Sequence, residues 1–210
     1  DGASGTAVLL ELARVIPASS RSDVELVFFD AEDSGYYEGW SWIVGSTHYV
    51  AELPPERRST IRAMVLLDMV GDANLQLKRE LSSTRSLQDQ VWSIAASLGH
   101  DDVFLSSYGG SIIDDHRPFL DCGIPALDII QHDPFPWYWH TLEDTPDKCA
   151  AGSLEAVGRV IEAFVAQTAH QSTTFEPDGL SAGPVVLTLA IAAPVLVAVL
   201  YLRCRRPGHK

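Results

Sequence analysis

The sequence predicts an α/β domain in which helices flank a mainly parallel, mixed sheet. Short apolar runs of strand length alternate along the chain with longer stretches whose apolar residues recur at helical spacing. In addition, 46% of the 210 residues are hydrophobic and 20% are charged, so the chain has enough apolar surface to bury a core. This composition excludes an intrinsically disordered protein.

The first part of the chain contains a helix, a strand and a second helix. Residues 5–16 carry an apolar stripe with helical spacing, which predicts a helix. Residues 24–29, VELVFF, are apolar, β-branched and aromatic, which predicts a short strand, and an acidic string follows them. Residues 42–53 again have the pattern of a helix.

The second part repeats the alternation. Residues 64–70, MVLLDMV, predict a buried strand in which Asp68 is embedded. Residues 86–98 have one apolar face and predict an amphipathic helix. A strand over residues 125–130 and a helix over residues 154–169 complete the expected body.

The carboxyl-terminal segment has a different character. Residues 184–202 form a run of 19 uncharged, mostly apolar residues, close to the ~20 that a helix needs to cross a bilayer. Pro194 lies inside this run and disfavours the alternative of a buried soluble helix. We therefore expect a folded body over residues 1–170, a polar linker over residues 171–183, a transmembrane helix over residues 184–202, and a basic tail over residues 203–210. The positive-inside rule places the tail in the cytoplasm and the body on the extracytoplasmic side.

Charge excludes one class of partner. The whole chain has a net charge of −13, but residues 1–182 contain 11 basic and all 28 acidic residues and therefore carry −17. Such an acidic body repels phosphate backbones, so we expect no nucleic-acid partner. Three cysteines are too few for a disulfide-rich scaffold.

Acidic residues and one histidine lie at or near the ends of the predicted strands or at the starts of helices. Since the carboxyl ends of parallel strands meet at one edge of a sheet, we expect these side chains to converge there. Buried carboxylates are unfavourable by several kcal/mol unless they are paired or bind a cation. Zinc with oxygen and nitrogen ligands suits this set, with a remaining carboxylate as general base. The set consists of Asp1, Glu32, Asp33, Asp68, Asp114 and His140.

Each of these residues also has a simpler interpretation when it is taken alone. Asp68 is then a turn residue at a strand end, and Asp114 with Asp115 caps the following helix. Glu32 and Asp33 are then part of a solvated acidic loop.

Seven short motifs in a fixed order resemble family 28 of the metallopeptidases, which contains zinc aminopeptidases and glutaminyl-peptide cyclotransferases. The resemblance covers residues 1–168, and since the chain begins inside the first motif we expect an upstream part. The motifs are D-G-A-S-G (1–5), F-F-D-A-E-D (28–33), G-S (45–46), L-L-D-M-V-G (66–71), I-D-D-H-R-P-F-L (113–120), G-I-P-A-L (123–127) and W-H-T-L-E-D-T (139–145).

The resemblance implies a role for each matched residue. Asp1, Asp33, Asp68 and His140 match metal ligands, and Asp68 matches an active-site acid in the cyclases instead. Glu32 matches the general base. The family usually has Glu-Glu where this chain has Glu32-Asp33, which changes the ligand geometry but keeps a sound zinc ligand. A further histidine ligand of the family lies upstream of Asp1, so the resemblance leaves open whether the site holds one zinc ion or two.

Three functions follow from the resemblance as expectations. The first is hydrolysis at peptide or protein N-termini by metal-activated water. The second is cyclisation of N-terminal glutamine on a single zinc, which is favoured by Asp114 as a further catalytic acid and by a pocket of Trp40, Phe135 and Trp139. The third is an inactive membrane-anchored ectodomain that only binds partners.

Overall fold

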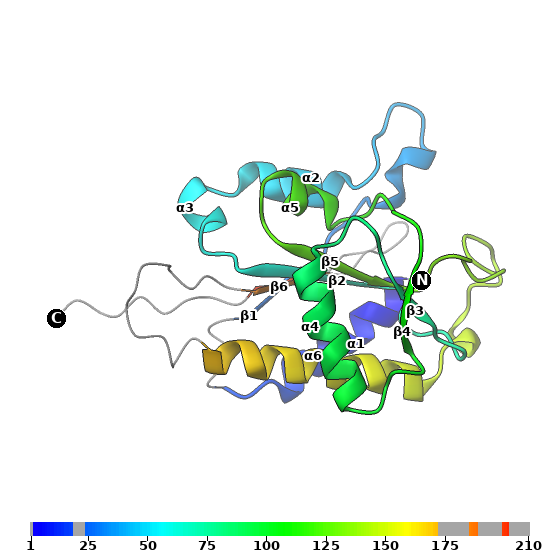
Figure 1. The fold of residues 1–210 in the computed structure, drawn as a ribbon. Helices are drawn as coiled ribbons and strands as arrows, with labels where there is room; N and C mark the ends of the chain where they lie inside the picture. The colour runs from blue at the N-terminus through cyan, green and yellow to red at the C-terminus, as the bar shows by residue number, and fades with distance from the viewer. Residues whose placement is uncertain (1, 19–23, 172–184, 189–198, 202–210) are drawn as a thin grey trace.

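The protein is described by a computed structural model that places residues 2–18, 24–171, 185–188 and 199–201 (Figure 1). Strands form the middle layer and helices cover both of its faces, which confirms the predicted α/β class with parallel strands. In the view of Figure 1, α2, α3 and α5 lie above the sheet, and α1, α4 and α6 lie below it.

The main sheet has the order β1 (Val24–Leu26), β6 (Val185–Thr188), β2 (Ala63–Asp68), β5 (Ala126–Ile130), and these four strands are parallel. All residues of β2 and β5 are buried, as expected for parallel strands that are covered on both faces. Asp68 pairs in register with Ile130, so β2 and β5 end at the same level. This shared end is where the acidic residues gather.

The helices pack on the sheet through their apolar stripes. Fully buried side chains of α1 and α6, such as Leu9 and Phe164, join Met64 of β2 in one hydrophobic core. One face of the sheet carries α1 (Gly2–Val15), α4 (Arg85–Ser97) and α6 (Ala151–Gln171). The other face carries α2 (Val44–Glu52), α3 (Pro55–Arg58) and α5 (Arg117–Asp121).

Several short elements were not expected from the sequence. A small parallel sheet pairs β3 (Leu77–Arg79) with β4 (Phe104–Tyr108), and its pairing shifts register between Leu77 and Arg79. The 3-10 turns η2 (Asp33–Tyr36) and η3 (Pro146–Lys148) are also new. Segments of three to five residues are too short to show a period in the sequence, so only their tertiary partners define them.

The carboxyl-terminal segment differs from the expected transmembrane helix wherever it is described. Among the described residues, no helix is long and apolar enough to cross a membrane. Two pieces of residues 184–202 are strands: β6 lies between β1 and β2, and β7 (Val199–Tyr201) pairs antiparallel with β6. A short run rich in valine suits a buried strand as well as a membrane span, which is why the sequence pattern did not separate the two. The rest of this segment, residues 172–183 of the linker and the tail 203–210 lie outside the described residues.

Candidate active site

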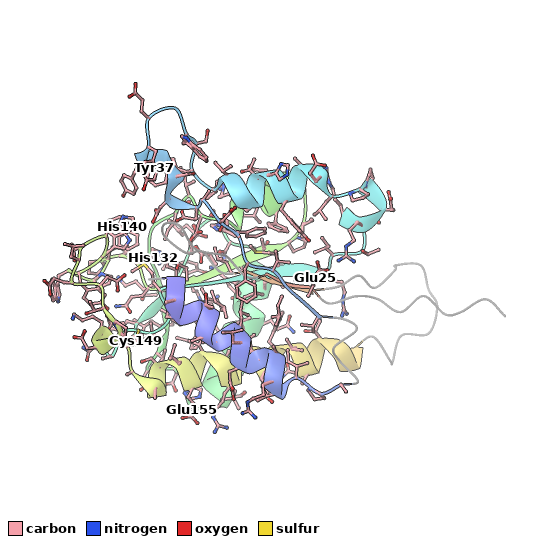
Figure 2. The ribbon with its side chains drawn as sticks, turned by 180° about the vertical axis from the view of Figure 1, so that it is seen from behind. Glu25, Tyr37, His132, His140, Cys149 and Glu155 are labelled. Carbon is pink, nitrogen blue, oxygen red and sulfur yellow. The ribbon has the colours of Figure 1, made fainter. Side chains whose placement is uncertain are left out.

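The predicted site residues meet at one end of the main sheet. Figure 2 shows His140 at this end of the molecule, opposite Glu25 of β1. Glu32 follows β1, Asp68 is the last residue of β2, and His140 follows β5. The parallel arrangement therefore brings these residues together, although they are far apart in the sequence.

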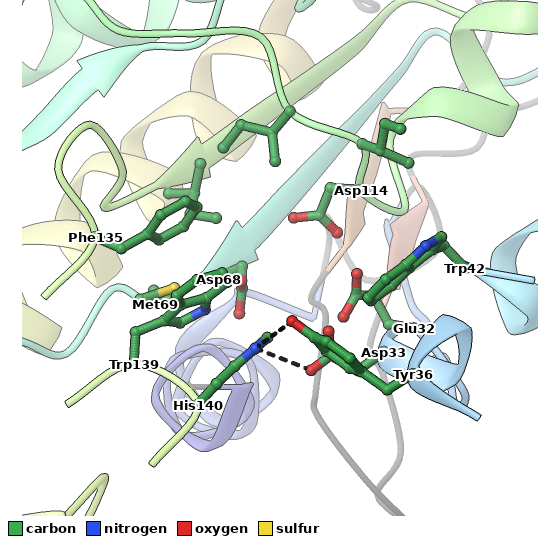
Figure 3. A pocket seen from close by; sticks show the side chains of 13 residues that line it. Glu32, Asp33, Tyr36, Trp42, Asp68, Met69, Asp114, Phe135, Trp139 and His140 are labelled. Atoms are coloured by element: carbon green, nitrogen blue, oxygen red, sulfur yellow. Dashed lines mark hydrogen bonds and ion pairs between the residues drawn. The ribbon is translucent and has the colours of Figure 1, made fainter. Parts of the chain in front are cut away.

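A pocket of about 260 Å³ lies at this edge and opens between loops from the two helical layers (Figure 3). The carboxylates of Glu32, Asp68 and Asp114 point towards its centre. Aromatic and aliphatic side chains form the remaining walls. The lining residues are Glu32, Asp33, Tyr36, Trp42, Asp68, Met69, Ile112, Ile113, Asp114, Ile130, Phe135, Trp139 and His140.

The acidic loop after β1 is held by the amino-terminal end of α2. The backbone N–H groups of residues 43, 44 and 45 donate to the carbonyls of residues 32, 31 and 30 at 2.8, 3.1 and 3.2 Å. A Cβ on Gly45 would lie 2.3 Å from the carbonyl oxygen of Asp30, so this close approach requires glycine. The G-S motif at 45–46 thus fixes the backbone that presents Glu32 and Asp33.

His140 is fixed from several sides. Its Nε2 lies 3.2 Å from Oδ2 of Asp33, and its Nδ1 lies 2.9 Å from the hydroxyl of Tyr36. The ring stacks on Trp139 with centroids 4.0 Å apart, and Trp139 stacks in turn on Phe135 at 4.2 Å. Asp33 and His140 thus converge with their oxygen and nitrogen donors facing each other.

The backbone is in an uncommon conformation next to three site residues. Ala31, Met69 and His140 have φ values of 55°, 48° and 56°, in the left-handed region that non-glycine residues seldom adopt. Such conformations cost about 1–3 kcal/mol each and are concentrated at functional sites. Here they turn the chain just before Glu32, just after Asp68 and at His140 itself, where the pocket is formed.

The pocket acids are poorly compensated by the described residues. Burial first, and repulsion from Asp114 next, raise the pKa of Glu32 to about 11. The same two causes raise the pKa of Asp68 well above its usual range. Oδ1 of Asp68 is buried and has no hydrogen-bond partner among the described residues. For Asp114, burial and repulsion from Asp115 raise the pKa in the same way. A divalent cation would offset this repulsion.

The donors present fit a divalent cation in their chemistry. Asp33 and His140 offer one carboxylate and one imidazole to the same space, and Asp68 contributes an unpartnered oxygen nearby. Within the described ranges, no group of three or more His, Cys, Asp or Glu side chains is already arranged to hold a metal. Asp1, the further ligand that the motif resemblance implies, lies outside the described residues.

Of the predicted site residues that the structure describes, all but Trp40 share this pocket. Glu32, Asp33, Asp68, Asp114, Phe135, Trp139 and His140 all line it. Trp40 does not line it and is 60% exposed, whereas Trp42, two residues further along the same loop, is a lining residue. Tyr36 and Trp42 were not predicted, because nothing in their local pattern distinguishes them from other loop residues. Met69 was expected only as part of a buried strand and not as a pocket residue.

A second group of buried polar residues lies deeper in the molecule, behind Asp114. Glu80 accepts five hydrogen bonds of 2.6–3.0 Å, from the backbone and hydroxyl groups of Ser82 and Ser83 and from the N–H of Ile112. Burial alone would raise the pKa of Glu80, but His116, whose Nε2 lies 3.5 Å from Oε2, and the hydrogen bonds from Ser82 outweigh it and hold the pKa well below the usual range.

Asp128 lies on the other side of His116, with Oδ2 3.6 Å from Nδ1 of His116. Neither carboxylate oxygen of Asp128 has a hydrogen-bond partner within the described ranges. Burial, and then repulsion from Asp114, raise the pKa of Asp128. Since 3.6 Å is too long for a hydrogen bond, little in the described ranges offsets burial, which favours the neutral form of Asp128. His116 belongs to the I-D-D-H-R-P-F-L motif, but Glu80 and Asp128 were not expected here, because the members of this group are spread over four segments.

Known proteins resemble this chain in sequence and in fold. The model of Peptidase family M28 matches residues 1–165. The chain is 28% identical over 205 residues to the glutaminyl-peptide cyclotransferase of Bos taurus, which covers 81% of this chain and 56% of that protein. It is 32% identical over 176 residues to aminopeptidase YwaD of Bacillus subtilis (strain 168), which covers 79% of this chain and 36% of that protein.

Among solved structures, a Zn-dependent exopeptidase from Parabacteroides distasonis matches with a TM-score of 0.69 and 33% identity, over 79% of this chain and 62% of that one. The chain thus spans about half of the cyclotransferase and about a third of the aminopeptidase. The match to the family model extends over most of the chain and includes every pocket acid. The chain therefore belongs to peptidase family M28.

Proposed function

We propose that this protein is a zinc-dependent enzyme that acts at the N-termini of peptides, with hydrolysis of the first peptide bond as its reaction. One observation carries the proposal: Glu32, an acid with a raised pKa, lies in the same pocket as the converging donors of Asp33 and His140. Without a cation the raised pKa keeps Glu32 protonated. A divalent cation held by Asp33 and His140 would favour the ionised form, which can then accept a proton as general acid–base catalysis requires.

Asp33 and His140 would hold the zinc ion, together with Asp1 and, where a second ion binds, Asp68. Bound zinc supplies Lewis-acid polarisation of the substrate carbonyl and lowers the pKa of water. The acidic pocket also suits a substrate that carries a positively charged α-amine, because the carboxylates of Asp68 and Asp114 face the same space.

Glu32 carries the proton in this proposal. It accepts a proton as the nucleophile attacks and returns it to the leaving amine. Asp114 is buried next to Glu32 and affects its protonation through their mutual repulsion. Because the chain retains these acids and His140, an ectodomain that only binds partners is disfavoured.

Cyclisation of N-terminal glutamine is the second candidate, and the aromatic wall favours it. Phe135 and Trp139 stack in parallel, with an interplanar angle of 10°, and form one side of a pocket of only about 260 Å³. A compact aromatic pocket suits a folded glutaminyl side chain whose α-amine attacks its own γ-amide, with release of ammonia. Glu32 would carry the proton in this reaction too.

One assay separates the two candidates. The zinc-loaded protein is incubated with a panel of aminoacyl reporter substrates and, in parallel, with a peptide that begins with glutamine. Release of the reporter without ammonia supports hydrolysis, and stoichiometric ammonia with loss of the free α-amine supports cyclisation. If neither product forms in protein that contains zinc, the proposed function is wrong.

We also propose that residues 184–202 anchor the protein in a membrane, with the body on the extracytoplasmic side and residues 203–210 in the cytoplasm. The support is the uncharged run followed directly by Arg203, Arg205 and Arg206. The position of β6 inside the sheet is the competing arrangement. Extraction of membranes with alkaline carbonate tests the proposal: an anchored chain stays in the pellet, and release into the supernatant contradicts an anchor.

A further inference from the structure

We propose that Tyr36 is a positioning residue for His140: its hydroxyl orients the imidazole so that Nε2 is available to a divalent cation held with Asp33. This inference rests on the proposed function in one respect, namely that Asp33 and His140 bind a cation. Tyr36 lies outside the acidic motifs, so the inference extends the proposed metal site to the loop that contains Tyr36.

The geometry places the Tyr36 hydroxyl against one nitrogen of the imidazole, beside Asp33 at the wall of the pocket. Its hydroxyl lies 2.9 Å from Nδ1 of His140, and the two rings meet edge to face with centroids 5.4 Å apart. Nε2 of the same imidazole faces Asp33 at 3.2 Å (Figure 3). One ring nitrogen is thus occupied by Tyr36 while the other points to the cation ligand.

Trp139 and Trp42 restrict the same pair of rings. The indole of Trp139 stacks on His140 with centroids 4.0 Å apart, and Trp42 meets Tyr36 edge to face at 4.6 Å. The backbone of His140 has a φ of 56°, so local conformational preference does not by itself fix the direction of the side chain. The contacts with the surrounding rings and with the Tyr36 hydroxyl fix it instead.

A single 3-10 turn provides two partners of His140, Asp33 and Tyr36. Asp33 is the first residue of η2 and Tyr36 is the last, so they are three positions apart. Side chains at i and i+3 of a 3-10 helix lie nearly above one another. The cation ligand and the positioning hydroxyl therefore move as one unit, and the η2 turn sets the distance between them.

A hydroxyl is well suited to this position. A histidine that binds a cation through Nε2 is neutral and carries its proton on Nδ1, which must then donate a hydrogen bond. A tyrosine hydroxyl accepts that bond, and it also donates when Nδ1 has no proton. Partners of this kind around a metal-binding histidine typically contribute a factor of about 10–100 in metal affinity.

Tyr36 contributes little to the core, which separates positioning from a structural role. The residue is 63% exposed, so removal of its hydroxyl leaves the hydrophobic core unchanged. The adjacent Tyr37 is a matched control, because it is 61% exposed, belongs to the same loop and does not line the pocket. The two substitutions Tyr36→Phe and Tyr37→Phe delete the same atom at neighbouring positions.

The test measures zinc affinity directly in the full chain, by competition with a fluorescent zinc chelator and without any substrate. We expect Tyr36→Phe to weaken zinc binding about tenfold and Tyr37→Phe to change it less than twofold. With Co²⁺ in place of zinc, the visible absorption bands should shift in Tyr36→Phe and stay unchanged in Tyr37→Phe. The Tm of both metal-free variants should equal that of the wild type.

Two results overturn the inference. If Tyr36→Phe binds zinc within twofold of the wild type, the hydroxyl does not position His140, and the proposed function is unaffected. If Tyr36→Phe loses affinity only together with a lower Tm of the metal-free protein, Tyr36 is structural. Failure of the wild type to bind zinc would contradict the proposed function itself, so the two failures are distinguishable.

Discussion

The acids of the pocket and Glu80 are all buried or half-buried, yet their surroundings act on their carboxylates in opposite ways. Glu80 receives five hydrogen bonds, and its pKa is held well below the usual range. Glu32 and Asp68 lie among other acids, and burial raises the pKa of both. Hydrogen bonds stabilise Glu80 as an anion. For Glu32 and Asp68, the described residues do not offset the cost of burying a negative charge.

The contrast separates structural from functional acids. A buried carboxylate whose oxygens are fully hydrogen-bonded fixes the segments that donate to it. A group of buried acids that lacks enough hydrogen-bond donors destabilises the folded protein. Such groups are concentrated at sites of catalysis or binding. Glu80 is therefore assigned to the fold, where it joins residues 82–83 to residue 112, whereas Glu32 is the acid for which we propose a role in proton transfer.

The largest effect is expected at Glu32. Glu32→Gln keeps the shape of the side chain but removes its ability to accept a proton, so turnover should fall about 10³-fold while zinc content is retained. Steady-state kinetics and metal analysis check this result. Glu38→Gln, an exposed acid of the same loop, is the matched control and should keep wild-type turnover. Full activity in Glu32→Gln would remove Glu32 from the role of proton carrier.

The next largest effect is expected at Glu80, on stability. Glu80→Ala leaves the buried N–H of Ser83 and the N–H of Ile112 without their acceptor, so the free energy of unfolding should fall by about 3 kcal/mol. Urea denaturation measures the change. Glu155→Ala removes an exposed ion pair with Arg159 as the control and should change stability by less than about 1 kcal/mol. A loss of that small size at Glu80 would contradict its structural role.

The third prediction concerns pH and metal together. The folded pKa of Asp115 is raised to about 8 by burial and by repulsion from Asp68, and that of Glu32 to about 11. The folded metal-free protein then binds more protons than the unfolded chain above the unfolded values near ~4. Stability should fall as pH rises from about 4 to 8, by up to about 1.4 kcal/mol per pH unit for each proton.

Zinc should flatten this decline, because its charge favours the ionised acids. Thermal unfolding across this pH range, with a chelator and with zinc, checks both parts. Glu80 acts with the opposite sign: since its folded pKa is lowered, its contribution is present above the unfolded value and is lost as pH falls. A metal-free protein whose stability does not change between pH 5 and 8 would contradict the raised pKa values.

The smallest effect is expected at Asp128. This buried acid serves as a comparison with Glu80, because it lacks the hydrogen bonds that Glu80 accepts. Asp128 is as buried as Glu80 but its oxygens lack hydrogen-bond partners within the described ranges, and its pKa is raised by burial. Asp128→Asn replaces a neutral acid with a neutral amide of the same size, so stability should change by less than about 1 kcal/mol. Urea denaturation of this variant beside Glu80→Gln measures the difference. A loss at Asp128 as large as at Glu80 would show that both acids are ionised.

The sequence predicted the elements that have a clear period or a long apolar run. The helices over α1, α2, α4 and α6 and the strands β1, β2 and β5 were expected within a few residues of their observed bounds. The strands β3 and β4 were not expected, because they are short and acquire their partners only in the folded chain. Residues 185–188 and 199–201 were expected to be helical and are strands, since an apolar run rich in valine satisfies either environment.

For the site, the sequence supplied the acids and the histidine but not their surroundings. Glu32, Asp33 and His140 were predicted because the motifs that contain them resemble those of a known family in the same order. All three line the pocket. Tyr36 and Trp42 did not stand out, and the pocket contains them because the η2 turn and the following loop bring them against His140. A loop residue that acts through a contact more than a hundred positions away leaves no local signal.

By itself the sequence determined the chemistry that is available: the α/β layering, the acids at the strand ends and the family to which the chain belongs. These properties follow from residue type and short-range spacing, which the chain carries in any conformation. Only the tertiary structure decided which buried acids receive hydrogen bonds and what holds His140. Both depend on burial and on donors from distant segments, and the linear order of residues does not specify either of them.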